Sequence, residues 1–216
     1  MNKYALGTIV GTALLGFAKA KRGGKNEYKP DSIEDIYNLS AQEKTQITEL
    51  NLYRKGLTHL PDDIFDGFIN LEKLILENNR LTELPDSIGD LTNLKTLYLD
   101  ANQLTELPDS IGNLTNLKDI YLRNNQLTEL PDSIGNLTNL EWLILAANKL
   151  TELPDSIGNL TNLKTLPLGG NPWKKPVPKE IILKMIRNRV HKDVIQEIIR
   201  MNNFLPTESK SNLRLR

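Results

Sequence analysis

The chain has 216 residues, of which 39% are hydrophobic and 25% are charged, a composition that can bury one sizeable core. It contains no cysteine, which excludes disulfide bonds, thiolate zinc sites and a cysteine nucleophile. The formal net charge is zero, but residues 71–162 hold 14 acidic and 6 basic residues, whereas residues 163–216 hold 4 acidic and 12 basic residues.

Residues 1–26 are predicted to form an apolar signal or anchor segment followed by a basic linker. An uncharged apolar run starts at Tyr4, and more basic residues follow it than precede it. The run length and the small-x-small pattern ending at Ala20 are typical of a signal peptide cleaved near Ala20, which would give a secreted protein. The basic residues after the run instead favour an uncleaved membrane-associated helix over residues 4–20, with the rest of the chain on the cytosolic side. The third interpretation is that the segment does neither and the protein is cytoplasmic.

Residues 27–46 are predicted to form an N-terminal cap over the repeats that follow. Asp31 or Ser32 would serve as the N-cap of a short helix, which has acidic residues in its first turn. The apolar residues that would share one face of this helix are Ile33, Ile36 and Tyr37.

Residues 47–173 repeat one pattern. Five full units and a partial sixth begin at Ile47, Leu71, Leu94, Leu117, Leu140 and Leu163. The units follow the spacing L-x-x-L-x-L-x-x-N-x-L. Three of them continue as LTELPDSIGNLTNL, and a fourth differs from this stretch only in having Asp90 in place of Asn. The last two leucines of L-x-x-L-x-L lie two residues apart, so on a strand both point into the core and the residue between them points away. Each copy therefore predicts one short parallel strand.

This signature resembles that of the leucine-rich repeat family, in its 23-residue class with the continuation L-x-x-L-P-x-x-I-G-x-L-x-x-L. The resemblance covers residues 47–173. It implies an α/β fold, a right-handed leucine-rich repeat solenoid shaped as a horseshoe arc, with a concave parallel β-sheet and a helical C-terminal cap. The class includes intracellular Ras-associated and scaffold-type proteins and bacterial proteins. The resemblance therefore implies a non-catalytic module that binds a protein partner, as a scaffold, adaptor or inhibitor in signalling.

An asparagine follows each predicted strand from the second unit onward, whereas the first unit has Lys55 at that position. A buried amide has two donors and one acceptor, which can satisfy loop backbone groups of its own repeat and of its neighbour. We therefore expect a structural ladder formed by Asn79, Asn102, Asn125, Asn148 and Asn171.

Residues 174–205 are predicted to form a helical C-terminal cap, and residues 206–216 a disordered polar tail. Trp173 is expected to be a lid over the last leucines. Apolar spacing predicts one long helix, or two with a break near His191. The residues at this spacing are Ile181, Ile182, Met185, Ile186, Val190, Val194, Ile195, Ile198 and Ile199. The opposite face is either a solvated surface or a contact for anionic lipid or an acidic partner, and its basic residues are Lys184, Arg187, Arg189, Lys192 and Arg200.

Catalysis is not expected from this sequence. The two histidines, His59 and His191, lie far apart along the repeats and lack the spacing of a metal site. The recurring acidic residues belong to the repeat itself, and no G-x-x-x-x-G-K-[ST] phosphate-binding loop is present. We predict no catalytic residue, metal, cofactor or small-molecule substrate, and the acidic repeats disfavour nucleic acid.

Differences between the copies gather at strand positions that face away from the core. Exposed framework positions such as Glu83 and Asn93 are the same in each unit of residues 71–162, although packing hardly requires them to be. We interpret the strand positions as a binding surface; the alternatives are uneven homogenisation by copying, and aromatics that only pack across the sheet. The predicted partner-binding residues are Ile75, Tyr98, Asp119, Tyr121, Arg123, Trp142 and Ile144.

A rival interpretation assigns the biological role to residues 1–26. The protein would then be a membrane- or envelope-tethered structural or adhesive protein, and the repeats would serve as a spacer. Membrane contact would run through residues 4–20 and the basic C-terminal helix.

Overall fold

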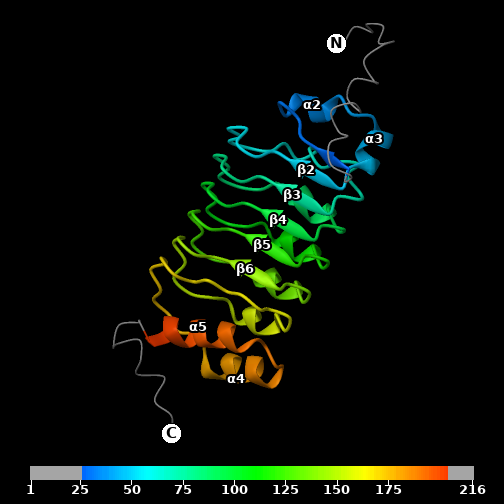
Figure 1. Ribbon diagram of the computed structural model, residues 1–216. Coiled ribbons are helices and arrows are strands. Elements are labelled where there is room, and N and C mark those ends of the chain that lie inside the picture. Colours follow the sequence, from blue (N-terminus) through cyan, green and yellow to red (C-terminus); the bar gives the residue numbers. More distant parts are fainter. Residues whose placement is uncertain (1–25, 204–216) are drawn as a thin grey trace, which may run out of the picture.

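The computed structural model describes residues 26–203 as one stack of short strands with a helical cap at each end (Figure 1). The N-terminal segment predicted at residues 1–26, apart from its last residue, and the tail predicted at residues 206–216 lie outside the described residues. Six parallel strands lie side by side in chain order. They are β1 (Glu27–Tyr28), β2 (Glu49–Asn51), β3 (Lys73–Ile75), β4 (Thr96–Tyr98), β5 (Asp119–Tyr121) and β6 (Trp142–Ile144).

The strand register follows the alignment of the repeats. Tyr98 on β4 pairs with Ile75 on β3 and with Tyr121 on β5. The central residue of each strand from β2 to β6 is buried and its two neighbours are not. An isolated bridge between Trp142 and Thr165 extends the pairing into the partial sixth unit. The predicted parallel-sheet solenoid and its register are therefore confirmed.

Four units return behind the sheet through short 3-10 helices. These are η1 (Asp86–Asp90), η2 (Asp109–Asn113), η3 (Asp132–Asn136) and η4 (Asp155–Asn159). A proline with extended backbone precedes each helix, where its missing N–H costs no hydrogen bond. In the second of them Ile111 points inward and is fully buried, as is Leu114 directly after it. Because such leucines of successive units share one core, the stack is stable only through contacts between neighbours.

Buried asparagines join neighbouring units where the strands end. Asn125 Nδ2 donates to the carbonyl oxygens of Leu99 (2.9 Å) and Leu122 (3.2 Å), and its Oδ1 accepts from the backbone N–H of Leu104 (3.0 Å). Leu99 and Leu104 belong to the preceding unit, so one amide bridges two repeats. The same arrangement recurs at Asn79, Asn102, Asn148 and Asn171. These hydrogen bonds have the pattern expected of a ladder.

A second row of asparagines also connects the repeats, on the segments that lead into the strands. Asn116 Nδ2 donates to the carbonyl oxygen of Thr92 in the preceding unit at 2.9 Å. Equivalent bonds are made by Asn70, Asn93, Asn139 and Asn162. The expectation that packing hardly constrains the framework position of Asn93 was therefore wrong, because its amide holds the backbone of the unit before it.

Close contact between successive 3-10 helices constrains two further framework positions. A Cβ placed on Gly89 would lie 2.7 Å from the carbonyl oxygen of Ser110 and 2.8 Å from its Cβ, so only glycine fits there. Ser110 and its equivalents Ser87, Ser133 and Ser156 bury their hydroxyl oxygens without a hydrogen-bond partner in the described part of the chain. Packing thus accounts for much of the constant framework, and constancy alone does not identify a functional surface.

The first helix of the N-terminal cap does not begin as predicted. The helix α2 (Glu34–Tyr37) follows Ile33, and neither Asp31 nor Ser32 caps it with its side chain. Instead Asp35 Oδ2 accepts the backbone N–H groups of Asp31 (2.9 Å) and Ser32 (3.0 Å). The prediction was wrong because a carboxylate within the first turn reaches back to these donors.

The same cap contains elements that the sequence pattern did not indicate. The strand β1 pairs with β2, and α3 (Ala41–Gln46) begins with a capping box between Ser40 and Glu43. Ile36 is buried as expected, but Tyr37 is 45% exposed and its hydroxyl donates to Asp63 Oδ1 at 2.6 Å. The placement of Tyr37 on the apolar face was therefore wrong, because its hydroxyl has a partner outside the cap.

The C-terminal cap consists of two helices, α4 (Lys179–Arg187) and α5 (Lys192–Asn203), which is the second of the two predicted forms. Met185, Val194 and Ile198 are buried, and α4 packs against η4. Ile186 is 51% exposed and Ile199 43%, so their predicted inward orientation was wrong. Each short helix packs only a narrow face against the rest of the fold. Met185 lies on this face of α4, and Ile198 lies on this face of α5. Within residues 26–203 no helix combines the length and apolarity needed to cross a membrane.

Candidate partner-binding face

The outward side of strands β2 to β6 and of the residues after them carries three columns of side chains, which we call the sheet face. The middle column lies between the buried leucines and consists of Asn51, Ile75, Tyr98, Tyr121 and Ile144. The column two residues earlier consists of Glu49, Lys73, Thr96, Asp119 and Trp142. The column two residues later contains Tyr53, Glu77, Asp100, Arg123 and Ala146.

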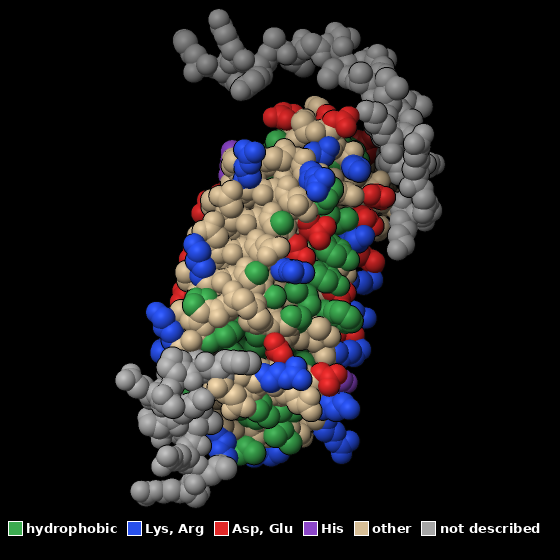
Figure 2. Space-filling view, turned by 60° about the vertical axis from the view of Figure 1, so that its left-hand side comes forward, with side chains coloured by type: hydrophobic (Ala, Val, Ile, Leu, Met, Phe, Trp, Pro, Cys, Tyr) green, Lys and Arg blue, Asp and Glu red, His purple; other side chains and the backbone are tan. Residues whose placement is uncertain are grey.

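All seven residues predicted to bind a partner lie on the sheet face. Trp142 pairs with Asp119 on the neighbouring strand, and Ile144 pairs with Tyr121. Figure 2 shows hydrophobic side chains gathered among acidic and basic ones on one side of the stack. The structure thus brings these residues together on one surface, and their part in binding stays a prediction.

Aromatic rings dominate the centre of this surface. The rings of Tyr98 and Tyr121 stack with centroids 4.6 Å apart and planes 6° from parallel. Lys73 Nζ lies 5.5 Å from the centroid of the Tyr98 ring, which places a cation beside the stack. Trp142 is 42% exposed although it stands on a regular strand. A large indole held on a fixed backbone in this way is a ready contact for another molecule.

Charged groups surround the rings. Lys73 Nζ forms an ion pair with Glu49 Oε1 at 3.0 Å. Asp119 Oδ2 accepts from the hydroxyl of Thr96 at 3.2 Å. Asp100 Oδ1 accepts from the backbone N–H of Arg123 at 2.6 Å, while the Arg123 guanidinium itself forms no ion pair within residues 26–203.

Partial burial perturbs the carboxylates of the sheet face. Loss of hydration raises the pKa of Asp119 above its usual value, although the Thr96 hydroxyl opposes the shift. Burial likewise raises the pKa of Asp100 against the effect of the Arg123 backbone N–H and charge. Burial first, and the charge of Asp100 second, raise the pKa of Glu77 against the opposing charge of Lys73. These half-buried carboxylates therefore lack full compensation for their charge.

Trp173 and the ladder asparagines lie away from the sheet face. Trp173 is half-buried against the core, and its Nε1 donates to the carbonyl oxygen of Leu168 at 3.1 Å. This position agrees with a lid over the last repeat. The ladder side chains point into the stack. Trp173 and the ladder asparagines therefore stabilise the fold that carries the sheet face and are not part of that face.

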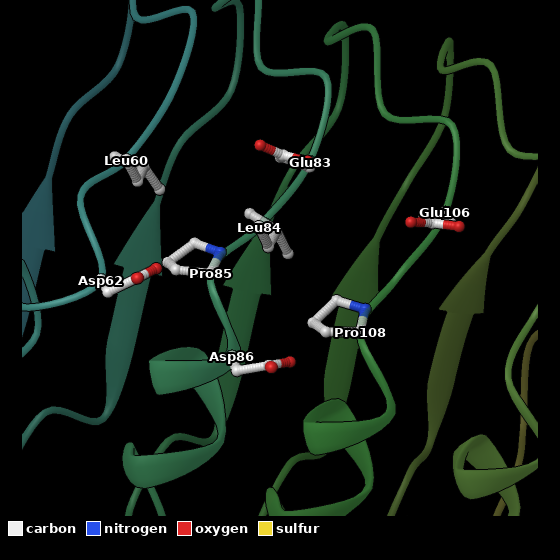
Figure 3. Close-up of a pocket in the computed structure, with 8 residues that line it drawn as sticks. All are labelled: Leu60, Asp62, Glu83, Leu84, Pro85, Asp86, Glu106 and Pro108. Atoms are coloured by element: carbon white, nitrogen blue, oxygen red, sulfur yellow. The ribbon is translucent and has the colours of Figure 1, made fainter.

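Two grooves lie elsewhere, on the loops that lead into the 3-10 helices. One of about 340 Å³ is lined by Glu83, Glu106 and the prolines Pro85 and Pro108 on successive loops (Figure 3). A groove of the same volume recurs between Pro131 and Pro154. These grooves are a product of the repeat, and their exposed acidic residues are the recurring ones of the sequence.

The described residues offer little for catalysis. No group of three or more His, Asp or Glu side chains within residues 26–203 is placed to hold a metal ion. His59 lies in the first unit and His191 between the two helices of the C-terminal cap, at opposite ends of the stack.

Some residues of the sheet face were not among the predicted site residues. Glu77 and Asp100 follow β3 and β4, and Lys73 lies on β3 beside the Tyr98 ring. The signal that could have found them is the period of the repeat, which puts them in the same columns as Arg123 and Trp142.

Comparison with known proteins gives one family and related structures. A family model described as Leucine rich repeat matches residues 45–104, 92–150 and 115–172. Among solved structures, a leucine-rich repeat protein of Leptospira interrogans has 36% sequence identity and a TM-score of 0.64. The match covers 74% of this chain and 40% of that chain, so this chain spans less than half of that protein. A search of curated proteins gives no match.

Proposed function

This chain belongs to the leucine-rich repeat family, whose domains generally bind other proteins and are typically non-catalytic, and from that premise we propose that it binds a protein partner on the sheet face. The binding residues would centre on Tyr121, Trp142 and Ile144, with Asp119 and Arg123 at their edges. The role would be that of a scaffold, adaptor or inhibitor.

The exposure of Trp142 is the observation that carries this proposal. Tyr98 and Tyr121 cover part of each other's surface, which is the cross-strand packing that aromatic residues also adopt for stability alone. Trp142 stacks on no other ring in the described part of the chain and remains 42% exposed. Tryptophan is enriched among the residues that dominate interface energetics, and its placement on a strand fixes it before binding.

The surface is also large enough for a stable contact. The five strands β2 to β6, together with the segment at Thr165 that pairs with Trp142, span about 24 Å at a spacing of about 4.8 Å. A standard interface buries about 800 Å² on each partner, which a patch of this width can supply.

Affinity capture with single variants tests the proposal. Trp142→Ala and Tyr121→Ala should each weaken partner binding by about 2 kcal/mol, or about thirtyfold in Kd, with little change in melting temperature. The matched controls are Glu129→Gln and Asp132→Asn, which change exposed acidic residues away from the sheet and should leave binding unchanged. If the controls abolish binding and the aromatic variants retain it, the sheet face is not the site.

The second candidate function, a membrane- or envelope-tethered structural or adhesive protein, rests on the apolar run within residues 1–26. Deleting residues 1–25 separates the two. Partner binding that survives the deletion supports the interaction module. Loss of every cellular phenotype on this deletion, with no phenotype from Trp142→Ala, supports tethering.

A further inference from the structure

Lysine–glutamate pairs one repeat apart are a regular feature of this solenoid. Nζ atoms of Lys95, Lys164 and Lys175 lie 2.5–2.6 Å from carboxylate oxygens of the preceding unit. On the sheet face the pair Lys73–Glu49 follows the same rule at 3.0 Å, and its ammonium also lies beside the Tyr98 ring. The chain itself therefore shows how this face accommodates a cation, between an aromatic ring and a carboxylate.

Three other carboxylates of the sheet face, those of Glu77, Asp100 and Asp119, form no ion pair within residues 26–203. The charges of Lys73, Arg123, Lys118 and Lys164 act on them only at longer range. Within residues 26–203 the Asp119 carboxylate hydrogen-bonds only to the Thr96 hydroxyl, and the Asp100 carboxylate only to the backbone N–H of Arg123. The Glu77 carboxylate makes no hydrogen bond or ion pair within residues 26–203. All three are half-buried, unlike Glu83, Asp109 and Asp132 of the outer loops, which are exposed. The raised pKa values of the three agree with burial that the hydrogen bonds and cations of the chain offset only in part.

The exposed indole stands next to this unpaired charge. Trp142 is the direct strand neighbour of Asp119, and Tyr121 lies on the same strand as Asp119, two residues later. If an arginine or lysine side chain packs on these rings, its cation lies within about one strand spacing, about 4.8 Å, of a carboxylate.

Resting on the proposed function, we infer that the partner presents a basic segment, whose arginine or lysine side chains lie on Tyr121 and Trp142 and pair with Asp119, Asp100 and Glu77. The segment runs across the strands, because the carboxylates lie on three successive units. These carboxylates would repel an acidic protein or a nucleic acid, because both carry charge of the same sign. A bound metal ion fits less well, because no described group of acidic side chains is placed to hold one.

Two synthetic peptides probe this inference with the full-length chain. One alternates arginine with threonine over twelve residues, and the other has glutamate in place of arginine. Fluorescence anisotropy at physiological ionic strength should show binding of the arginine peptide only. Combining Glu77→Gln, Asp100→Asn and Asp119→Asn should weaken that binding at least about tenfold, because three half-buried counter-charges are removed.

The matched control removes the same charges from the outer loops. Glu83→Gln, Asp109→Asn and Asp132→Asn give the same net charge as the first triple variant, so non-specific attraction to an acidic body changes equally in both. Binding in the control should stay within about twofold of the unsubstituted chain. Circular dichroism melts check that both variants fold.

The outcomes separate this inference from the proposed function. Equal losses in the two triple variants, no binding of the arginine peptide, or equal binding of the glutamate peptide overturns the basic-segment inference. If partner capture is then still lost in Trp142→Ala, the sheet face binds a partner of other chemistry. If Trp142→Ala also retains capture, the proposed function fails as well.

Discussion

Replacing the ladder residue Asn125 by alanine tests how neighbouring repeats are held together. The side chain is 7% exposed and makes three hydrogen bonds to backbone groups. The two carbonyl oxygens to which it donates each keep a second amide donor, from Asn102 or Asn148. The Leu104 N–H loses its only partner in the structure. One orphaned buried donor costs about 1–3 kcal/mol, and we expect Asn125→Ala to lower the free energy of unfolding by that amount.

The acidic variant Asn125→Asp extends the same test. Its carboxylate can still accept from Leu104, but it faces two carbonyl oxygens that need donors and it buries a charge. We expect a larger loss than in Asn125→Ala at pH 7. Burial raises the folded-state pKa of such a carboxyl, so the penalty is present above that pKa and should shrink as the pH falls through it.

Urea unfolding followed by circular dichroism measures these losses. The control is Asn113→Ala on η2, whose exposed side chain makes no hydrogen bond in the described part of the chain, and which should cost under about 0.5 kcal/mol. Equal losses for Asn125→Ala and Asn113→Ala would refute the assignment of the ladder.

Three further expectations follow. Gly112→Ala would place a Cβ 2.7 Å from the Cβ and carbonyl oxygen of Ser133, and should cost about 1–3 kcal/mol in urea unfolding. Truncation at Lys175 removes both cap helices and should lower the melting temperature or cause aggregation in size-exclusion chromatography; an unchanged monomeric transition would contradict the cap. Glu77→Gln should leave the melting temperature at pH 7 unchanged or higher, because burial raises the carboxyl pKa and its ionised form costs stability above that pKa. Any gain in melting temperature from Glu77→Gln should disappear when the pH falls below the pKa of the Glu77 carboxyl. A lower melting temperature of this variant at pH 7 would contradict the expectation.

The sheet and its register were predictable because the repeat fixes them. A leucine spacing of two within each unit and a nearly constant distance between units leave one way to stack the strands. The columns that contain Tyr98, Tyr121 and Trp142 followed directly from this spacing. The ladder asparagines were predictable for the same reason, since a polar residue next to buried strands needs partners for its amide.

The second row of asparagines could not be recognised from the sequence. Asn93 and Asn116 are exposed framework residues, and only the backbone of the preceding unit, which the sequence does not place, reveals their partners. The same limit applies to Gly89, which is required by the approach of Ser110 from the next repeat.

The caps were harder to predict because they lack a repeat. Asp35, not Asp31 or Ser32, satisfies the backbone donors before α2, and both choices fit the local sequence. Ile186 and Ile199 have helical spacing but are exposed. Apolar spacing predicts which side of a helix faces the core, but it does not predict how much of that side the last repeat covers. That the half-buried carboxylates of Glu77 and Asp100 form no ion pair within residues 26–203 depends on where the neighbouring cations lie, and that requires the structure.

Site-specific photocrosslinking tests the central claim most directly. A benzoylphenylalanine introduced at Ile144 on the sheet face should crosslink to the captured partner, and one introduced at Asp132 on the far side should not. The Ile144 crosslink should disappear when Trp142→Ala is added. Crosslinking from position 132 alone, or from both positions regardless of Trp142, would contradict the account that the sheet face is the binding surface.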